Sequence, residues 1–208
     1  MSAQHRSIAC KTSVRLVPWL LLVTASFSAS YVYAQAAESR SDSAVTVPAP
    51  GETRAELADL VPQQRFIGKG RLNYWGFHVY DARLWATPGF KIDKLAAQPF
   101  ALELAYMRDF DAVDVAERSI LEMRRSATIS DEQAKVWTAE MLRVFPNLKK
   151  GDRVMGVNKP GVGVAYLVNG KPTGEIKDLE FARLFFGIWL STKTSEPKLR
   201  SALLAGAM

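Results

Sequence analysis

Cysteine and histidine are nearly absent from this sequence, which has one cysteine and two histidines in 208 residues. Cys10 and His5 both lie in the first 34 residues, so His78 is the only histidine in the rest of the chain. Without a further cysteine, the folded part forms no disulfide and has no thiol nucleophile. With a single histidine it supplies neither a multi-histidine metal site nor the base of a serine or cysteine triad.

A strong excess of one charge is also missing. The chain has 27 basic and 21 acidic residues, and three of the basic ones, Arg6, Lys11 and Arg15, lie in the first 34 residues. The remainder therefore has 24 basic and 21 acidic residues, an excess of +3. This excess is too small to favour nucleic-acid binding. The sequence also has no basic stripe with interleaved aromatics, which such binding would favour.

The apolar run at residues 16–27 is too short for the roughly 20 residues of a membrane-spanning helix, and it contains Pro18. It follows three basic residues and precedes small residues at 32–34, the order typical of a cleaved signal peptide. We predict a signal peptide at residues 1–34, export to the periplasm and no stable membrane span after cleavage. A retained anchor is the alternative. Cys10 precedes the apolar run, which argues against a lipid-modified cysteine.

Residues 35–61 contain few large apolar side chains and are expected to form a flexible leader, with a short helix possible at 52–60. Residues 62–208 are rich in aromatics and have the length of one domain. The sequence thus predicts three parts: signal peptide, leader and a single folded domain.

Residues 68–85 have the pattern of a β-hairpin with a two-residue turn at Trp75-Gly76. The expected cross-strand pairs are Tyr74 with Phe77, Asn73 with His78, Leu72 with Val79 and Arg71 with Tyr80. Because side chains alternate along strands, Arg71, Asn73, His78 and Tyr80 would then share one face. An arginine opposite a tyrosine suits a carboxylate or phenolate, since both side chains donate hydrogen bonds. The alternative is an ordinary solvated sheet face.

The rest of the domain alternates between strands and helices. Residues 100–107 predict a strand with Phe100, Leu102, Leu104 and Tyr106 on one side, so that Tyr106 faces the same cavity as the hairpin. Helices are expected after Asp111, with Asp114 paired to Arg118 and Val113 on the apolar side, and after Ser130, ending before Pro146. Further strands are expected at 153–158, 162–168 and 172–176, a helix at 179–190 capped by Asp178, and a last helix from about 195 to 206. This order predicts an α+β fold, an antiparallel sheet with helices on one side.

Two short motifs resemble ligand sites but lack essential parts of them. The Gly-Lys-Gly at residues 68–70 has no strand-turn-helix setting, so we interpret it as a strand distortion or a close backbone approach. Asp109, Asp111 and Asp114 lack the downstream spacing of a calcium loop. We therefore predict no metal site and no cofactor.

Four segments in order, at residues 68–85, 108–119, 145–152 and 185–190, resemble the chalcone isomerase-like family, specifically its exported bacterial branch. The likeness covers residues 66–204. It implies an open-faced β-sandwich, in which helices cover one face of a large antiparallel sheet and a ligand cleft lies between them.

Plant chalcone isomerases use an arginine on this hairpin together with several polar partners. Arg71 matches the arginine, but Tyr80 stands where the threonine belongs and Leu184 replaces a late polar residue. Phe110 lies near the tyrosine position, and Glu117 or Arg118 occupies the asparagine position. Most of the groups that would stabilise the reacting ketone are thus missing.

Fatty-acid-binding relatives of the same fold hold a carboxylate with an arginine and a tyrosine on this hairpin, and Arg71 and Tyr80 fit that pair. The resemblance therefore implies an exported, non-catalytic protein that binds a fatty-acid-like amphipathic carboxylate. The expected ligand-binding residues are Arg71, Tyr80, Asn73, His78, Tyr106 and Phe186.

Two alternatives remain open at this stage. One is an intramolecular lyase or isomerase for a phenolic or enone substrate, with Arg71 as electrophile and Tyr80 or Tyr106 as proton donor. The other is an interaction protein without a small ligand, whose protein partner the sequence does not identify. Trp85, Phe110 and Phe186 are large enough to fill the cleft.

Overall fold

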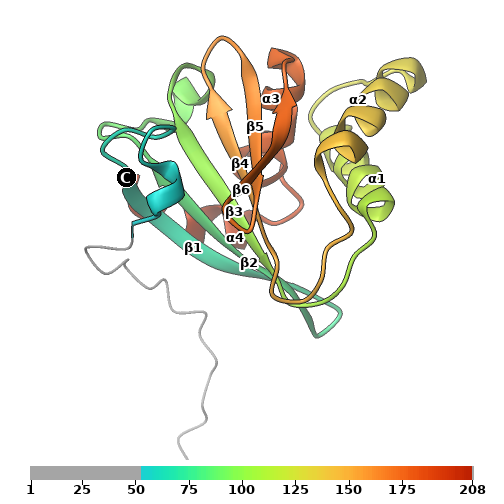
Figure 1. Ribbon diagram of the computed structural model, residues 1–208, viewed down its shortest axis with the longest axis horizontal. Coiled ribbons are helices and arrows are strands. Elements are labelled where there is room, and N and C mark those ends of the chain that lie inside the picture. The colour runs from blue at the N-terminus through green and yellow to red at the C-terminus, as the bar shows by residue number, and fades with distance from the viewer. Residues whose placement is uncertain (1–52, 208) are drawn as a thin grey trace, which may run out of the picture. The chain divides into compact units, whose positions relative to one another are not determined.

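Six antiparallel strands form one sheet in the order β1-β2-β3-β4-β5-β6, so every strand pairs with its neighbours in sequence (Figure 1). The computed structural model describes residues 53–207, and the predicted signal peptide, with Cys10, and residues 35–52 of the leader lie outside them. The strands are β1 (Arg65–Tyr74), β2 (Phe77–Ala86), β3 (Phe100–Tyr106), β4 (Arg153–Lys159), β5 (Gly163–Val168) and β6 (Lys171–Ile176).

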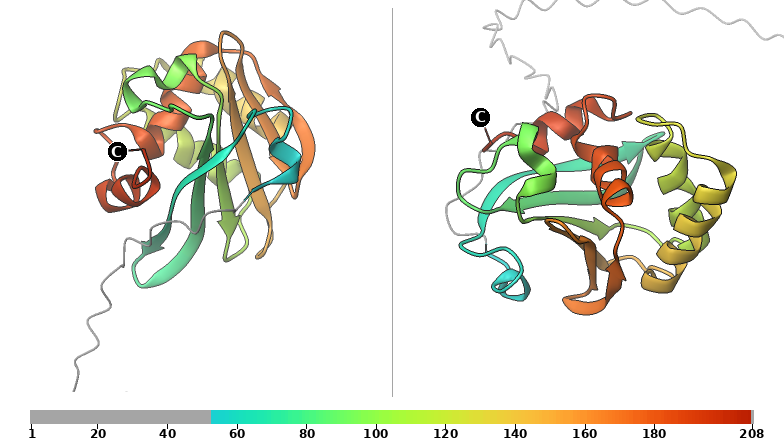
Figure 2. Two further views of the ribbon diagram at one scale, coloured as in Figure 1. Left: turned by 90° about the vertical axis from the view of Figure 1, so that its left-hand side faces the viewer. Right: turned by 90° about the horizontal axis from the view of Figure 1, so that it is seen from above.

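Among the described residues, four α-helices and two 3-10 helices accompany the sheet. They are α1 (Ala112–Met123), α2 (Asp131–Val144), α3 (Leu179–Leu190), α4 (Pro197–Leu203), η1 (Ala55–Leu57) and η2 (Ile92–Ala97). The four α-helices lie on one side of the sheet, with α4 against β1 and α3 against β5, whereas η1 lies on the other side (Figure 2). The structure thus has the α+β layering expected from the sequence. Among residues 53–207, no helix is long and apolar enough to cross a membrane.

Local hydrogen bonds start two of the helices where the sequence predicts. The hydroxyl of Ser130 accepts from the backbone N–H of Gln133, 3.1 Å away, and α2 begins. The carboxylate of Asp178 accepts from the N–H of Phe181 at 2.8 Å and also from the indole N–H of Trp137 at 2.9 Å. Asp178 therefore starts α3 and fastens it to α2.

Helix α1 differs from its prediction in three respects. Arg118 bonds to Glu122 at 2.6 Å instead of Asp114, because Glu122 is the carboxylate one turn further along and lies at the buried side. Val113, expected on the apolar side, is 48% exposed. Asp111 occupies the N-cap position, but its side chain makes no cap bond and Asn147 accepts from the first N–H instead.

The face of the sheet opposite the α-helices has a small core of its own. Leu57 and Val61 are fully buried there and pack with Trp85 and neighbouring apolar residues of the sheet. Glu103, which is fully buried on the same face, receives hydrogen bonds from Arg54, Arg83 and Arg153. The segment before residue 62, expected to be part of a flexible leader, thus packs on the sheet from about Arg54 onward.

The glycines at 68 and 70 let α4 approach β1 closely, as one of the two interpretations of this motif anticipated. A Cβ atom on Gly68 would collide with the carbonyl oxygen of Ala202. One on Gly70 would lie 2.6 Å from Cδ1 of Leu199. The strand is also distorted here, with a register shift between Phe66 and Gly68, so both interpretations are confirmed.

Candidate functional site

The β1–β2 hairpin turns at Trp75 and Gly76, whose φ angles of 51° and 80° match the two-residue turn expected from the sequence. Tyr74 pairs with Phe77, and Asn73 pairs with His78, as predicted. The register then shifts by one residue. The following pairs are Leu72 with Tyr80 and Arg71 with Asp81, and Val79 is the extra residue of a β-bulge.

The prediction that Arg71 lies opposite Tyr80 is therefore wrong. The bulge turns Tyr80 toward the helices, where it lies beside Leu72, and leaves Arg71 on the other face. Two hydrogen bonds of 2.6 and 3.0 Å join the Arg71 guanidinium to the carboxylate of Asp81. These bonds lower the pKa of Asp81 below its ordinary value.

Asn73 and His78 stay with Arg71 on the outer face, as the alternation predicted for these three residues. Nδ1 of His78 lies 2.6 Å from Oδ1 of Asn73, and both side chains are exposed. Neither residue lines the cavity described below, and neither does Arg71. The polar face of the hairpin is thus a solvated surface bound together by cross-strand pairs.

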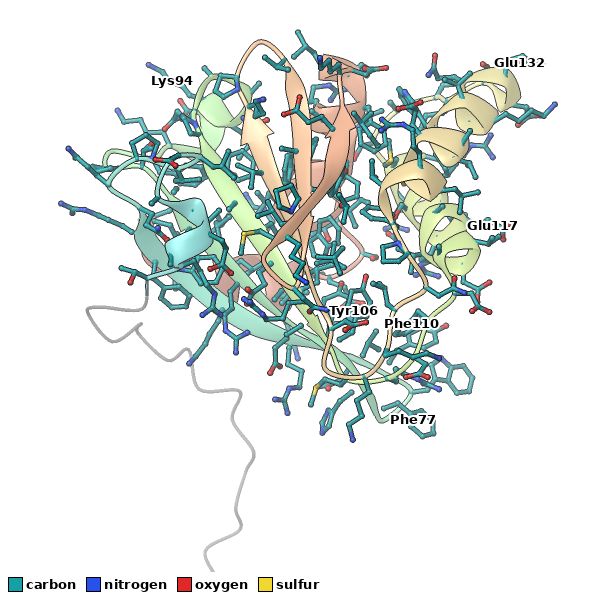
Figure 3. All side chains as sticks on the ribbon, in the orientation of Figure 1. Phe77, Lys94, Tyr106, Phe110, Glu117 and Glu132 are labelled. Carbon is teal, nitrogen blue, oxygen red and sulfur yellow. The ribbon has the colours of Figure 1, made fainter. Side chains whose placement is uncertain are left out.

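A cavity of about 390 Å³ lies on the opposite side, between the sheet and helices α1 and α3. Most of its wall is apolar. Its apolar and aromatic lining residues are Leu72, Tyr74, Phe77, Val79, Tyr80, Leu104, Tyr106, Phe110, Val115, Phe145, Leu148, Val154, Phe185, Ile188 and Trp189. Figure 3 shows Tyr106 and Phe110 close together beneath the helix pair, with Phe77 at the end of the hairpin. The cleft is open.

Two of the six predicted site residues, Tyr80 and Tyr106, meet in this cavity. Their rings pack edge to face with centroids 5.8 Å apart, and both residues are buried. The Tyr80 hydroxyl accepts a 2.8 Å hydrogen bond from Nε1 of Trp189. Burial raises the pKa of both phenols well above the ordinary tyrosine value, so both are neutral hydrogen-bond donors.

The third aromatic of the predicted site, Phe186, does not line the cavity. It is buried behind the wall and packs on Phe100 with ring centroids 4.5 Å apart. Trp85 lies on the opposite face of the sheet. Of Trp85, Phe110 and Phe186, which are large enough to fill the cleft, only Phe110 lines the cavity.

Carboxylates lie at the Tyr80 side of the cavity. Glu122 accepts hydrogen bonds from Arg118 at 2.6 Å and from the Ser195 hydroxyl at 2.9 Å. Glu122 and Glu196 are both near enough to disfavour negative charge on Tyr80, which contributes to the raised pKa of that phenol. Arg118 acts in the opposite direction but is already bonded to Glu122, so this side of the cavity disfavours a further anionic group.

The exposed residues of the lining lie between the hairpin and α1, and we call this side the mouth of the cavity. Arg108 is one of these exposed residues. Its guanidinium carbon lies 5.5 Å from the ring centre of Phe77 and 6.0 Å from that of Phe110. Among residues 53–207 it forms no ion pair with a carboxylate. A guanidinium held between aromatic rings and free of a carboxylate partner is well suited to bind an anionic group.

Arg108 was missed in the sequence, although a signal was present. It lies two residues after Tyr106, and the alternation that placed Tyr106 in the cavity extends to Arg108 one step past the end of β3. The hydrogen bond from Trp189 to Tyr80 joins residues 109 positions apart, and no local pattern encodes such a contact.

A family model described as chalcone isomerase-like matches residues 68–205, about two thirds of the chain. The chain belongs to the chalcone isomerase-like family. A protein of Haemophilus influenzae, described only as uncharacterised, is 25% identical over 138 residues. That match covers 66% of this chain and 66% of the relative, just under two thirds of each.

A solved structure with a similar fold is that of the Arabidopsis thaliana fatty-acid binding protein AtFAP1. The TM-score is 0.57 at 14% sequence identity, with 72% of this chain and 91% of that chain covered. At this identity the likeness shows the fold alone: the six-stranded sheet and its helices have the architecture of the chalcone isomerase-like family.

Proposed function

We propose that this chalcone isomerase-like protein binds a fatty-acid-like amphipathic carboxylate without transforming it. One observation carries the proposal: an open apolar cavity has at its mouth a guanidinium, that of Arg108, with no carboxylate partner among the described residues. The other charged residues of the lining are Asp114, Glu122 and Glu196, which are acidic, and Arg118, which is paired with Glu122. An apolar wall with one unpaired cation at its mouth matches a ligand with a long apolar tail and an anionic head.

The charges around the cavity favour one orientation of this ligand. Arg108 attracts the carboxylate at the mouth, while Glu122 and Glu196 disfavour it beside Tyr80. The tail then extends inward along Leu104 and Ile188. The head group therefore binds at Arg108, in place of the Arg71 and Tyr80 pair expected from the sequence.

The size of the cavity agrees with this ligand class. Small-molecule pockets typically measure about 300–1,000 Å³, and the 390 Å³ found here falls near the lower end. The similar solved structure is described as a fatty-acid binding protein, which supports the same ligand class for this chain.

The isomerase alternative lacks its main residue in the cavity. Its electrophile was to be Arg71, which lies on the outer face of the sheet and is bonded to Asp81. The two neutral phenols of Tyr80 and Tyr106 remain as proton donors, but the Tyr80 hydroxyl is already engaged by Trp189. The geometry thus favours binding over catalysis.

Isothermal titration with matched ligands tests the proposal. Dodecanoate, dodecanol and dodecanoate methyl ester share one tail and differ in the head group. We expect saturable binding of one dodecanoate per protein and at least about tenfold weaker binding of the two uncharged ligands, which cannot form a charge-assisted hydrogen bond. Equal affinity for all three would contradict an anionic head site. No uptake of any of them would contradict the binding function.

We further propose that the protein acts after export, with residues 1–34 removed. The support is the order of basic residues, apolar run and small residues in that segment. Mass spectrometry of the protein isolated from the periplasm of its host should give an N-terminus near Gln35. An intact N-terminus on a cytoplasmic protein would refute export.

A further inference from the structure

The end of the β1–β2 hairpin exposes three aromatic side chains within four residues of the strands and turn. Trp75 is 85% exposed, Phe77 63% and Tyr74 56%. We call these three residues the hairpin tip. Figure 1 shows the tip projecting beyond the helices at one end of the sheet. Exposed aromatics gathered in this way commonly mark a surface that contacts another molecule.

Trp75 is an unfavourable residue for its own place in the turn. Its φ of 51° lies in the left-handed region, where bulky side chains are strained and where asparagine or glycine is preferred. The side chain gains little burial in exchange, and it does not line the cavity. An exposed tryptophan that opposes the local turn preference is typical of a functional contact.

The hairpin tip is continuous with the mouth of the cavity. Tyr74 and Phe77 line the cavity with one part of their surface and are exposed with the rest, and Arg108 stacks on Phe77. Whatever contacts the tip therefore also lies next to the entrance through which a ligand must pass. The cation of Arg108 is directly beside that contact.

The small size of the tip distinguishes between possible occupants. A large aromatic side chain buries about 150–250 Å², so three of them supply about 450–750 Å². A stable protein interface needs about 800 Å² on each partner. A bilayer surface has no such threshold, because a few aromatic side chains inserted among lipid head groups contribute independently. Tryptophan and tyrosine are also the side chains that concentrate at the membrane interface.

We propose that the hairpin tip docks the protein on a lipid bilayer, with the cavity mouth facing the head groups, so that an acyl carboxylate passes between membrane and cavity. The inference rests on the proposed function for the identity of what passes. Trp75 inserts among the head groups, and Tyr74 and Phe77 flank the opening. The bilayer is both the docking partner and the reservoir of the ligand.

A single substitution separates docking from ligand binding. Trp75→Asn removes the most exposed aromatic side chain and places a favoured residue in the turn, while leaving every residue of the cavity wall in place. Leu179→Asn is the matched control. Leu179 is 57% exposed and follows the end of β6. Across the sheet, the end of β6 is aligned with Ala86, which lies at the opposite end of the hairpin from the tip. Leu179 is therefore exposed but distant from the tip.

The experiment measures flotation of the chain from Gln35 onward with vesicles of phosphatidylcholine and phosphatidylglycerol. This chain retains all of residues 53–207, which the structure describes, and lacks the apolar run at 16–27, which would itself bind lipid. We expect wild type and Leu179→Asn to bind equally and Trp75→Asn to bind about tenfold more weakly. Dodecanoate binding without vesicles should be equal in all three proteins.

Each other result overturns a defined part of the proposal. No vesicle binding by wild type, or equal binding by Trp75→Asn, refutes docking, and dodecanoate binding in the same samples then leaves the proposed function standing. Vesicle binding through Trp75 without dodecanoate binding refutes the ligand and retains the docking. If wild type self-associates without binding vesicles, and Trp75→Asn does not self-associate, the tip contacts a second copy of the chain. That result refutes docking on a membrane.

Discussion

The indole Nε1 of Trp189 donates a 2.8 Å hydrogen bond to the hydroxyl of Tyr80, joining α3 to β2 beside the cavity. Both residues are buried, so neither group has water as a ready substitute. The bond holds the two walls of the cavity at a fixed separation. It also directs the proton of the Tyr80 hydroxyl away from Trp189, since the oxygen is the acceptor.

Tyr80→Phe leaves the indole N–H of Trp189 without this acceptor in a buried site. We expect the free energy of unfolding to fall by about 1–3 kcal/mol, the usual cost of an unpaired buried donor. Urea unfolding followed by circular dichroism measures it. Tyr106→Phe is the control, because the Tyr106 hydroxyl bonds to no residue among 53–207. Its free energy of unfolding should fall clearly less than that of Tyr80→Phe. Equal losses would contradict a structural role for the Trp189 bond.

The buried carboxylate of Glu103 holds three arginines against the outer face of the sheet. Its side chain is fully buried and lies 2.6 Å from Arg153, 2.9 Å from Arg54 and 3.2 Å from Arg83. Glu103→Gln should lower the free energy of unfolding by about 3–5 kcal/mol, because it leaves these cations without their shared anion.

Glu56→Gln is the comparison for Glu103. Among residues 53–207, the Glu56 carboxylate forms an ion pair with Arg153 alone, at 3.1 Å, and it is partly exposed, so we expect a loss below about 1 kcal/mol. Neither variant should change dodecanoate affinity, because both residues lie outside the cavity wall. An altered dodecanoate affinity in Glu103→Gln would indicate that the ligand binds on the face of the sheet that carries Glu103, opposite the proposed cavity.

Stability should fall steeply at alkaline pH. Burial raises the pKa of Tyr80, Tyr106 and Tyr166 well above the ordinary value of about 10. Above about pH 10 the unfolded chain therefore loses these protons more readily than the folded protein does. The stabilisation is fully present below that pH and is lost as pH rises toward the folded-state pKa.

Absorbance of tyrosinate, measured together with circular dichroism, checks this dependence. The protein used begins at Gln35 and carries Tyr74→Phe, which removes the exposed phenol. We expect the tyrosinate signal of the three buried residues to appear together with the loss of secondary structure. Ionisation of any of them in the folded protein near pH 10 would contradict their burial.

Filling the cavity should abolish ligand uptake while the fold persists. Ile188 is half-buried and lines the cavity from α3, so Ile188→Trp places an indole where the acyl tail would lie. We expect dodecanoate affinity to fall at least tenfold, with overpacking costing about 1–3 kcal/mol of stability. Leu179→Trp, an exposed position on the same helix, should retain wild-type affinity. Retained uptake by Ile188→Trp would place the ligand elsewhere.

Elements with local chemical signals were predicted well. The turn at Trp75-Gly76, the Ser130 cap and the helix opened by Asp178 all depend on contacts within a few residues, and all were confirmed. The inward side of β3 was also predicted, because strict alternation fixes it. These features are decided by backbone conformation and side-chain period, which a sequence displays directly.

The site was predicted only in part, and the cause is one extra residue. Val79 forms the bulge without any glycine or proline to signal it, and the shift reverses the faces of Tyr80 and Arg71 relative to each other. Arg118 presents a similar choice, with an acidic residue four positions away on either side. In the structure Arg118 bonds to Glu122, which also accepts a hydrogen bond from Ser195. No local sequence pattern predicts the long-range bond from Ser195.

The most direct test of the account compares two arginines. Arg108→Ala removes the guanidinium at the cavity mouth, and Arg71→Ala removes the same charge from the outer face, where it bonds to Asp81. By titration with dodecanoate, we predict that Arg108→Ala weakens binding about 10- to 100-fold, the worth of one charge-assisted hydrogen bond. Arg71→Ala should bind as wild type does. Unchanged affinity in Arg108→Ala, or a loss confined to Arg71→Ala, would contradict the proposed site.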